Sequence, residues 1–166
     1  DFSLPGVDGV RYSLNDFKQK KLLGVIFTCN HCPYAQAYED RIIAIQREYA
    51  EKGVQLVLIC SNDAENYPED NLEQMKIRAR EKRYPFPYLR DDSQEAAKAY
   101  DAACTPEIYL FDGERRLRFH GRVDDNYEEP KKVKKQYLRD AIDDLLAGLE
   151  VRVPESHPIG CSIKWA

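Results

Sequence analysis

Two continuous apolar runs of strand length lie within the first 60 residues. They cover residues 22–27 (LLGVIF) and 54–60 (VQLVLIC), and neither shows regular alternation with polar positions. An uninterrupted run of this length is typical of a strand covered on both faces, as in a parallel sheet. The sequence therefore predicts two buried parallel strands that lie next to each other.

The hydrophobic pattern changes to a helical period at Pro33. Proline suits the first turn of a helix, because its missing N–H group would have no partner there, and Gly53 marks the end of the segment. The apolar face of this predicted helix comprises Tyr38, Ile42, Ile45 and Tyr49.

Further helices are predicted after the second strand. Residues 72–79 carry a shorter amphipathic pattern, and residues 94–100 form a short helical piece. A long helix is predicted over residues 131–149, with the basic run 131–135 (KKVKK) on its solvated face. The apolar stripe of that helix comprises Leu138, Ile142, Leu145 and Leu149.

Two Asp-Gly pairs predict hairpins. Asp8-Gly9 lies within SLPGVDGVRYSL, and Asp112-Gly113 separates IYLF from LRFH. The element order is then hairpin, β, α, β, α, short α, ββ, α and a tail. A β-α-β unit followed by an antiparallel hairpin and a helix predicts an α/β fold with a mixed central sheet flanked by helices on both faces.

Composition limits the classes of protein that need to be considered. The 166 residues fit one domain (1–166), which is long enough to bury a core without disulfides or metal. Lys and Arg number 25 against 29 Asp and Glu, so nothing indicates nucleic acid or an anionic membrane as a partner. No apolar run approaches the roughly 20 residues of a membrane span. We expect a monomer.

Five cysteines are present, an odd number that is too small for a disulfide-dense secreted scaffold. We expect a cytoplasmic protein. A periplasmic or exported form stays open, because the sequence begins at Asp1 without a methionine and an N-terminal segment could have been removed.

Cys29 and Cys32 enclose Asn30 and His31 between the first buried strand and the predicted helix. The pair could be a metal clip, a structural disulfide or a reactive dithiol. A structural zinc site needs further ligands and no second C-x-x-C is present, while a disulfide across so short a loop stabilises little. The free N–H groups at a helix start stabilise a thiolate, the nucleophilic form. We predict a redox dithiol with no metal and no cofactor, in which Cys29 attacks and Cys32 resolves.

These motifs resemble a known superfamily. Strand–CxxCP–helix, then a strand, then Thr105-Pro106 before a hairpin, resembles the thioredoxin superfamily, and the leading hairpin resembles its redoxin/AhpC–TSA and ResA/TlpA-like branch. The resemblance implies a thiol–disulfide oxidoreductase that acts on protein disulfides or dithiols, with a reductase as a further partner. It also implies a cis bond at Pro106, facing the dithiol, and a Thr105 that binds an incoming peptide. Within that branch the chain resembles a group of bacterial thioredoxin-like proteins through CNHCPY, YPEDN, FPYLRD, CTPEIYLFD and GCSIKW, and this resemblance covers nearly the whole chain.

The chain departs from thioredoxins in two places. Leu23 stands where thioredoxins carry a buried acid, so we expect proton transfer at Cys32 to use water or Glu107. His31 resembles the histidine of the CPHC motif in the oxidase DsbA, whose thiol has a pKa of about 3.5. We expect His31 to pair with the Cys29 thiolate and make the disulfide more oxidising. The alternative is a solvated His31 without effect.

Two other functions stay open. A peroxidase would carry Thr or Ser three residues before its reactive cysteine, but Ile26 and Cys29 occupy those positions before Cys29 and Cys32. A non-catalytic binding module would keep the fold, with cysteines that hold metal or nothing.

Three further cysteines, Cys60, Cys104 and Cys161, lie outside the motif. Cys60 is expected to be a small packing residue, whereas Cys104 either packs or joins a disulfide relay near the dithiol. The tail 151–166 contains Ile and Trp, so we expect it to dock on the body. Docking could bring Cys161 as a third thiol, or Lys164 as a cation, to the site. Auxiliary roles are thus expected for Pro33, Cys104, Cys161 and Lys164.

Overall fold

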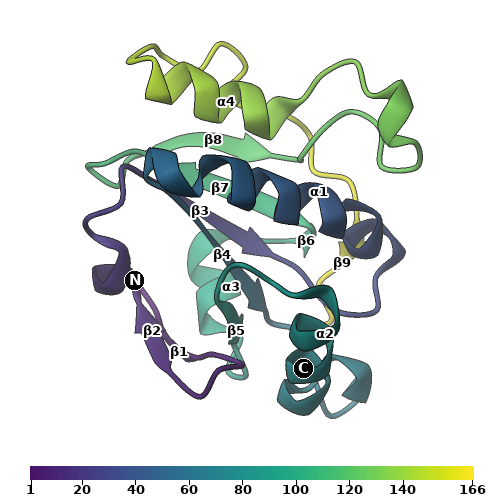
Figure 1. The fold of residues 1–166 in the computed structure, drawn as a ribbon. Coiled ribbons are helices and arrows are strands. Elements are labelled where there is room, and N and C mark those ends of the chain that lie inside the picture. Colours follow the sequence, from purple (N-terminus) through teal and green to yellow (C-terminus); the bar gives the residue numbers. More distant parts are fainter.

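The structure, a computed structural model, describes all 166 residues. Its central sheet has the strand order β5-β4-β3-β7-β8, as Figure 1 shows. Strands β3 (Leu22–Phe27), β4 (Val54–Cys60) and β5 (Tyr88–Arg90) run parallel to one another, whereas β7 (Glu107–Phe111) and β8 (Leu117–Gly121) form an antiparallel hairpin beside β3. The predicted mixed sheet is confirmed.

Four α-helices flank the sheet. Helix α1 (Pro33–Tyr49) begins with a proline in its first turn, as predicted, and lies on the same face of the sheet as α4 (Tyr137–Leu146). Helix α2 (Leu72–Lys82) contributes Met75 to the core on that face. Helix α3 (Glu95–Tyr100) packs against the opposite face.

The two faces of the sheet each belong to a hydrophobic core, because successive strand residues point to opposite sides. Ile26 and Leu56 lie in the core beneath α1 and α4, and their neighbours Val25 and Val57 lie in the core with α3. All four side chains are fully buried. Burying one such aliphatic side chain stabilises the fold by about 1.5–3 kcal/mol, which explains the continuous apolar runs.

The N-terminal hairpin also forms as predicted. Strands β1 (Ser3–Pro5) and β2 (Arg11–Ser13) pair around a turn in which Gly9 has a positive φ of 81°. A bridge between Gly6 and Leu89 then ties the hairpin to strand β5 at the edge of the sheet.

The last helix is shorter than the prediction of residues 131–149. It begins at Tyr137, because clustered lysines repel each other at helical spacing and the preceding segment instead hydrogen-bonds to Asp125. The helix ends at Leu146, and Gly148 just after it has a positive φ of 76°. Leu149 is 58% exposed, so it does not belong to the buried apolar stripe of the helix. The basic run is solvent-exposed but does not form a helix face.

Short elements escaped prediction. Strand β6 (Cys104–Thr105) pairs with β9 (Cys161–Ser162), which lies in the tail, and β5 was not recognised. Single 3-10 turns are also present, at Leu14–Phe17, Ala50–Lys52, Pro68–Asp70 and Pro130–Lys132. No helix of the structure has both the length and the apolar character to cross a membrane.

Candidate active site

The dithiol lies where strand β3 ends and helix α1 begins. Cys32 is the N-cap of the helix and Pro33 occupies its first position, so the sequence turns directly from the buried strand into the helix. Both thiols are free. Cys29 retains 4% exposure and Cys32 none, so the attacking residue expected to be exposed is nearly covered in this state.

Thr105 connects the dithiol with the loop before strand β7. The Thr105-Pro106 peptide bond is cis. The sulfur of Cys29 lies 3.6 Å from Thr105 Oγ1, and the sulfur of Cys32 lies 3.5 Å from the carbonyl oxygen of Thr105. The structure therefore places Thr105, which precedes the cis bond to Pro106, against the pair of cysteines, as the resemblance implies.

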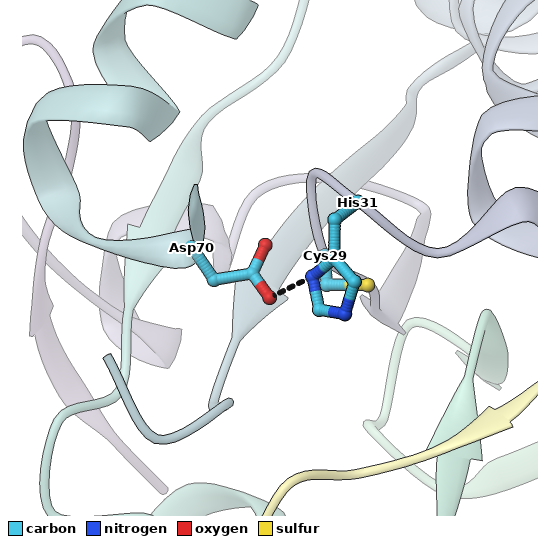
Figure 2. A group of neighbouring side chains, drawn as sticks. All are labelled: Cys29, His31 and Asp70. Carbon is cyan, nitrogen blue, oxygen red and sulfur yellow. Dashed lines mark ion pairs between the residues drawn. The ribbon is translucent and has the colours of Figure 1, made fainter. Parts of the chain in front are cut away.

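A buried carboxylate lies on the other side of the dithiol (Figure 2). The Nδ1 atom of His31 is 2.5 Å from Oδ2 of Asp70, which is 0% exposed. Asp70 also accepts hydrogen bonds from the backbone N–H of Asn30 at 2.7 Å and the side-chain amide of Asn62 at 2.9 Å. These partners compensate the desolvation of the carboxylate.

The partner of His31 differs from the sequence-based expectation. The ring forms an ion pair with Asp70, whereas the expected partner was the Cys29 thiolate. The ring also stacks on Tyr67, with ring centroids 5.9 Å apart. The Cys29 sulfur nevertheless belongs to the same cluster, since donor atoms of Cys29, His31 and Asp70 all lie within 4.8 Å of one another. His31 is therefore held beside Cys29 by an acid that the sequence analysis missed.

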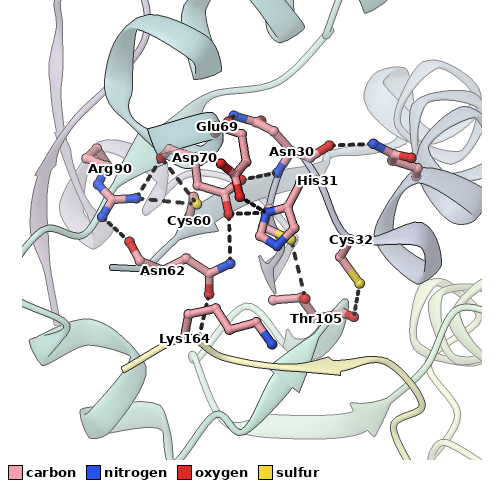
Figure 3. A network of polar contacts seen from close by, with 12 residues as sticks. Asn30, His31, Cys32, Cys60, Asn62, Glu69, Asp70, Arg90, Thr105 and Lys164 are labelled. Atoms are coloured by element: carbon pink, nitrogen blue, oxygen red, sulfur yellow. Dashed lines mark hydrogen bonds and ion pairs between the residues drawn. The ribbon is translucent and has the colours of Figure 1, made fainter. Parts of the chain in front are cut away.

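Arg90 contacts the backbone of this acid, on the left in Figure 3. Its side chain is buried, and Nη1 donates to the carbonyl oxygen of Asp70 at 2.9 Å and lies 3.4 Å from the sulfur of Cys60. The guanidinium also donates to the carbonyl oxygen of Asn62. Burial raises the pKa of Cys60 to about 12, so this thiol stays protonated at neutral pH. These contacts are consistent with a packing role for Cys60.

The pKa values of the two cysteines of the motif are shifted in opposite directions. The hydrogen bond with Cys32, burial and the nearby charge of Asp70 all raise the pKa of Cys29. The interaction with Cys29 lowers the pKa of Cys32 despite burial, and Cys161 acts in the same direction. The two shifts run in opposite directions, so the negative charge of the reduced pair is favoured on Cys32 over Cys29.

This assignment differs from the expectation that the helix start activates Cys29. Cys32 is the N-cap, so its sulfur lies at the start of the helix beside the free N–H groups of the first turn, although its side chain makes no capping hydrogen bond. Cys29 lies three residues earlier and faces the carboxylate of Asp70. The helix thus acts on the second cysteine.

Glu107 does not form the expected proton route from Cys32. Its carboxylate accepts hydrogen bonds from the backbone of Ala103 and Cys104, at 2.8 and 3.1 Å, and lies 2.5 Å from Nε2 of His120. The Tyr109 hydroxyl donates to it at 2.9 Å. These contacts connect the turn that precedes β7 with His120 of strand β8. None of them involves Cys32.

Of the residues expected to have auxiliary roles, Cys161 lies near the dithiol, whereas Cys104 contacts Glu107. Cys104 lies 3.8 Å from a Glu107 oxygen, and burial raises its pKa to about 12, so it is tied to that carboxylate. Cys161 faces Thr105 across the β6–β9 pair, which brings it to the dithiol. The Lys164 ammonium lies 5.9 Å from the centroid of the Tyr67 ring.

A metal ion could be held only through Cys29, His31 and Asp70, whose donor atoms meet in one cluster. Zinc bonds to nitrogen and oxygen of about 2.0–2.1 Å would separate two tetrahedral ligands by roughly 3.3 Å. The His31 and Asp70 atoms are closer, at 2.5 Å, and bind each other directly. The absence of a metal stays a prediction.

The chain was compared with known proteins. No curated protein matches it. An uncharacterized conserved protein from Geobacillus kaustophilus is 44% identical with a TM-score of 0.94, covering 99% of this chain and 88% of that chain. A hypothetical protein from Sinorhizobium meliloti is 41% identical with a TM-score of 0.95, covering 100% of this chain and 91% of that one.

More distant structures identify the fold. A secreted disulfide oxidoreductase from Mycobacterium tuberculosis is 15% identical with a TM-score of 0.59, covering 70% of this chain and 79% of that one. At this identity the likeness shows the fold alone, and it confirms the predicted thioredoxin fold. The Redoxin family model matches residues 1–137, most of the sequence. The chain therefore belongs to the Redoxin family, a branch of the thioredoxin superfamily.

Proposed function

We propose that the protein is a thiol–disulfide oxidoreductase that exchanges disulfides through Cys29 and Cys32. The observation that carries this proposal is the position of both sulfurs, at the strand–helix junction and against Thr105. Protein disulfides and small disulfides are the substrates that such a pair accepts. No cofactor is required, because thiol–disulfide exchange transfers two electrons between sulfur atoms alone.

Cys29 is the attacking residue, because it retains the little exposure that the pair has. Its thiol, whose pKa is raised, must first lose its proton. The imidazole of His31 can accept this proton, because its ring lies in one cluster with the Cys29 sulfur and the Asp70 carboxylate, with donor atoms of all three residues within 4.8 Å of one another. A nucleophile, a base and an acid that orients the base form the usual arrangement for activating a thiol.

Transfer of the proton to His31 leaves Cys32 as a thiolate for the second step. The Cys29 thiolate attacks one sulfur of the substrate disulfide, which breaks and releases the first substrate thiolate. The Cys32 thiolate then attacks the Cys29 sulfur of the mixed disulfide and releases the second substrate thiolate. The enzyme ends as the Cys29–Cys32 disulfide, and the substrate has gained two electrons.

Reduction of insulin disulfides by dithiothreitol tests this function. The wild-type protein should accelerate the reaction above the dithiothreitol background, and Cys29→Ser should abolish the acceleration. Cys60→Ala is the matched control, since Cys60 is a buried thiol outside the dithiol, and it should retain activity. The proposal is wrong if Cys29→Ser keeps the wild-type rate, or if the wild-type protein consumes hydrogen peroxide but leaves insulin intact.

A further inference from the structure

The tail of the chain is fixed to the body at several points near the dithiol. The backbone N–H of Asp63 donates to Lys164 O at 2.7 Å, and the backbone N–H of Lys164 donates to the side chain of Asn62 at 2.9 Å. Ile163 is buried, and its N–H donates to Ala103 O at 2.9 Å. Figure 3 shows Lys164 beside Asn62 and close to the network around Asp70. The tail is thus bound to the body of the protein beside the active site.

These anchors place strand β9 in a defined register on β6. Thr105 pairs with Cys161, and Cys104 pairs with Ser162, in an antiparallel arrangement. Gly160 permits this close approach, because a Cβ atom at that position would overlap the carbonyl oxygen of Thr105. The edge that the resemblance assigns to an incoming peptide is therefore occupied by the chain's own tail.

The register brings the Cys161 side chain to the second cysteine of the motif. Paired residues of an antiparallel ladder have Cα atoms about 4.5–5.5 Å apart, and Cys32 Sγ lies 3.5 Å from the carbonyl oxygen of Thr105, the partner of Cys161. The half-buried Cys161 side chain packs against the core cluster that contains Cys32, and Cys161 acts to lower the pKa of Cys32. The shared contact with Thr105 and this packing therefore bring Cys161 close to Cys32.

We propose that Cys161 is a third redox thiol of this site and forms a disulfide with Cys32 while the tail is docked. The inference rests on the proposed dithiol chemistry, and it adds a second disulfide to the one between Cys29 and Cys32. Cys104 lies on the same strand pair but is held by Glu107, so it does not take this role.

The step is an internal exchange that consumes no oxidant. The Cys161 thiolate attacks the Cys32 sulfur of the Cys29–Cys32 disulfide, the Cys32–Cys161 bond forms, and the Cys29–Cys32 bond breaks. The proton that leaves Cys161 is taken up by the Cys29 thiolate. One disulfide and one thiol are present before and after the step, and Cys29 is free to attack again.

The site becomes more favourable for this attack after the dithiol is oxidised. In the reduced state burial, the hydrogen bond with Cys32 and the charge of Cys32 raise the pKa of Cys161 to about 11, whereas Lys164 acts in the opposite direction. A disulfide at Cys32 is neutral, so the charge of Cys32 is then absent and the effect of Lys164 remains. The Cys161 thiol therefore ionises more readily in the oxidised protein than in the reduced one.

Disulfide mapping tests the proposal. The wild-type protein, Cys29→Ser, Cys29→Ala and Cys161→Ser are equilibrated with oxidised glutathione, blocked with N-ethylmaleimide, digested and analysed by mass spectrometry. In both Cys29 variants oxidised glutathione first forms a mixed disulfide with Cys32 or Cys161. The other of these two cysteines then attacks the mixed disulfide and releases glutathione as a thiol. We expect a Cys32–Cys161 linkage in more than about half of the molecules, because neighbouring thiols have a high effective concentration. Cys161→Ser should lack this linkage.

The outcomes separate this proposal from the proposed function. If both Cys29 variants keep Cys161 alkylatable while the wild-type protein forms the Cys29–Cys32 disulfide and reduces insulin, the third thiol is excluded and the function stands. If the variants form Cys32–Cys161 but the wild-type protein does not reduce insulin, the third thiol is supported and the function fails. A Cys104–Cys161 linkage in place of Cys32–Cys161 also overturns the proposal.

Discussion

Oδ2 of the fully buried Asp70 lies 2.5 Å from Nδ1 of His31, although the two residues are far apart in the sequence. This pair joins the 3-10 turn before α2 to the loop that carries the dithiol. Because Asp70 also binds the backbone of Asn30, within the motif itself, the acid fixes both the histidine and the loop. The position of the base is therefore set by an acid from outside the C-x-x-C motif.

Replacement of this acid should slow the reaction without unfolding the protein. We expect Asp70→Asn to lower the rate of insulin reduction by about tenfold or more, since a positioned proton acceptor commonly contributes about 10²–10⁴-fold. The asparagine keeps the shape and one acceptor oxygen, so the cooperative unfolding transition should remain. Glu69→Gln is the control, because Glu69 lies 3.8 Å from His31 Nδ1 and is half-exposed. Equal loss in both variants would contradict the role of Asp70.

The hydroxyl of Thr105 should influence the reactivity of Cys29. Its contact with the Cys29 sulfur, at 3.6 Å, acts to lower the pKa of that thiol against the hydrogen bond with Cys32, burial and Asp70, which raise it. We expect Thr105→Val to raise the pKa of Cys29 further and to slow its alkylation by iodoacetamide several-fold. Thr105→Ser retains the hydroxyl and should restore the wild-type rate. A Ser variant as slow as the Val variant would indicate a packing effect instead.

Docking of the tail should depend on Gly160. We expect Gly160→Ala to destabilise the fold by about 1–3 kcal/mol, the usual effect of overpacking, and to increase the alkylation rate of Cys161 as β9 leaves β6. Urea unfolding and peptide-resolved alkylation measure these two effects. At Gly113 a Cβ atom would meet nothing closer than 3.4 Å, so Gly113→Ala is the control and should change neither quantity appreciably. An unchanged alkylation rate of Cys161 in Gly160→Ala would show that docking of the tail does not depend on the close approach of Gly160 to Thr105.

The contribution of Glu107 to stability should disappear at acidic pH. Burial alone would raise the pKa of this carboxyl, but hydrogen bonds from Ala103, His120, Cys104 and Tyr109 outweigh burial and lower the pKa. A carboxyl with a lowered pKa in the folded state stabilises the protein fully above its unfolded value of about 4.3, and this stabilisation is lost as the pH falls through the folded value.

Thermal unfolding of wild-type protein and Glu107→Gln checks this behaviour. We expect the melting temperature of the wild-type protein to exceed that of the variant at pH 7, and the difference to shrink steadily below about pH 4. A difference that stays constant down to pH 3 would mean that the ionised carboxylate does not contribute to stability.

The parts of the fold that the sequence predicts are those with a local signal. Strands β3 and β4 appear as continuous apolar runs, and α1 begins at Pro33, so the junction that carries Cys29 and Cys32 could be located from local patterns. Strands β6 and β9 have only two residues each and show no periodicity. Their pairing depends on the docking of the whole tail.

The acid of the site had no local signal at all. Asp70 lies in the stretch YPEDN, where Pro68 and Asn71 indicate only a turn and a helix cap, and nothing there indicates burial of a carboxylate. Its burial depends on Arg90 and Asn62, which come from two other parts of the chain. The proximity of Cys161 to Cys32 likewise depends on a contact across most of the sequence.

Leu23, within strand β3, is wholly buried among apolar side chains, at the position where thioredoxins carry an acid. The carboxylate of this protein instead comes from a surface turn that packs against the sheet without being part of it. Substitutions in that turn can therefore retune the acidity of the reactive sulfurs during evolution while the apolar layer of strands stays unchanged. In a protein whose acid sits on the central strand, the same adjustment would disturb the core itself.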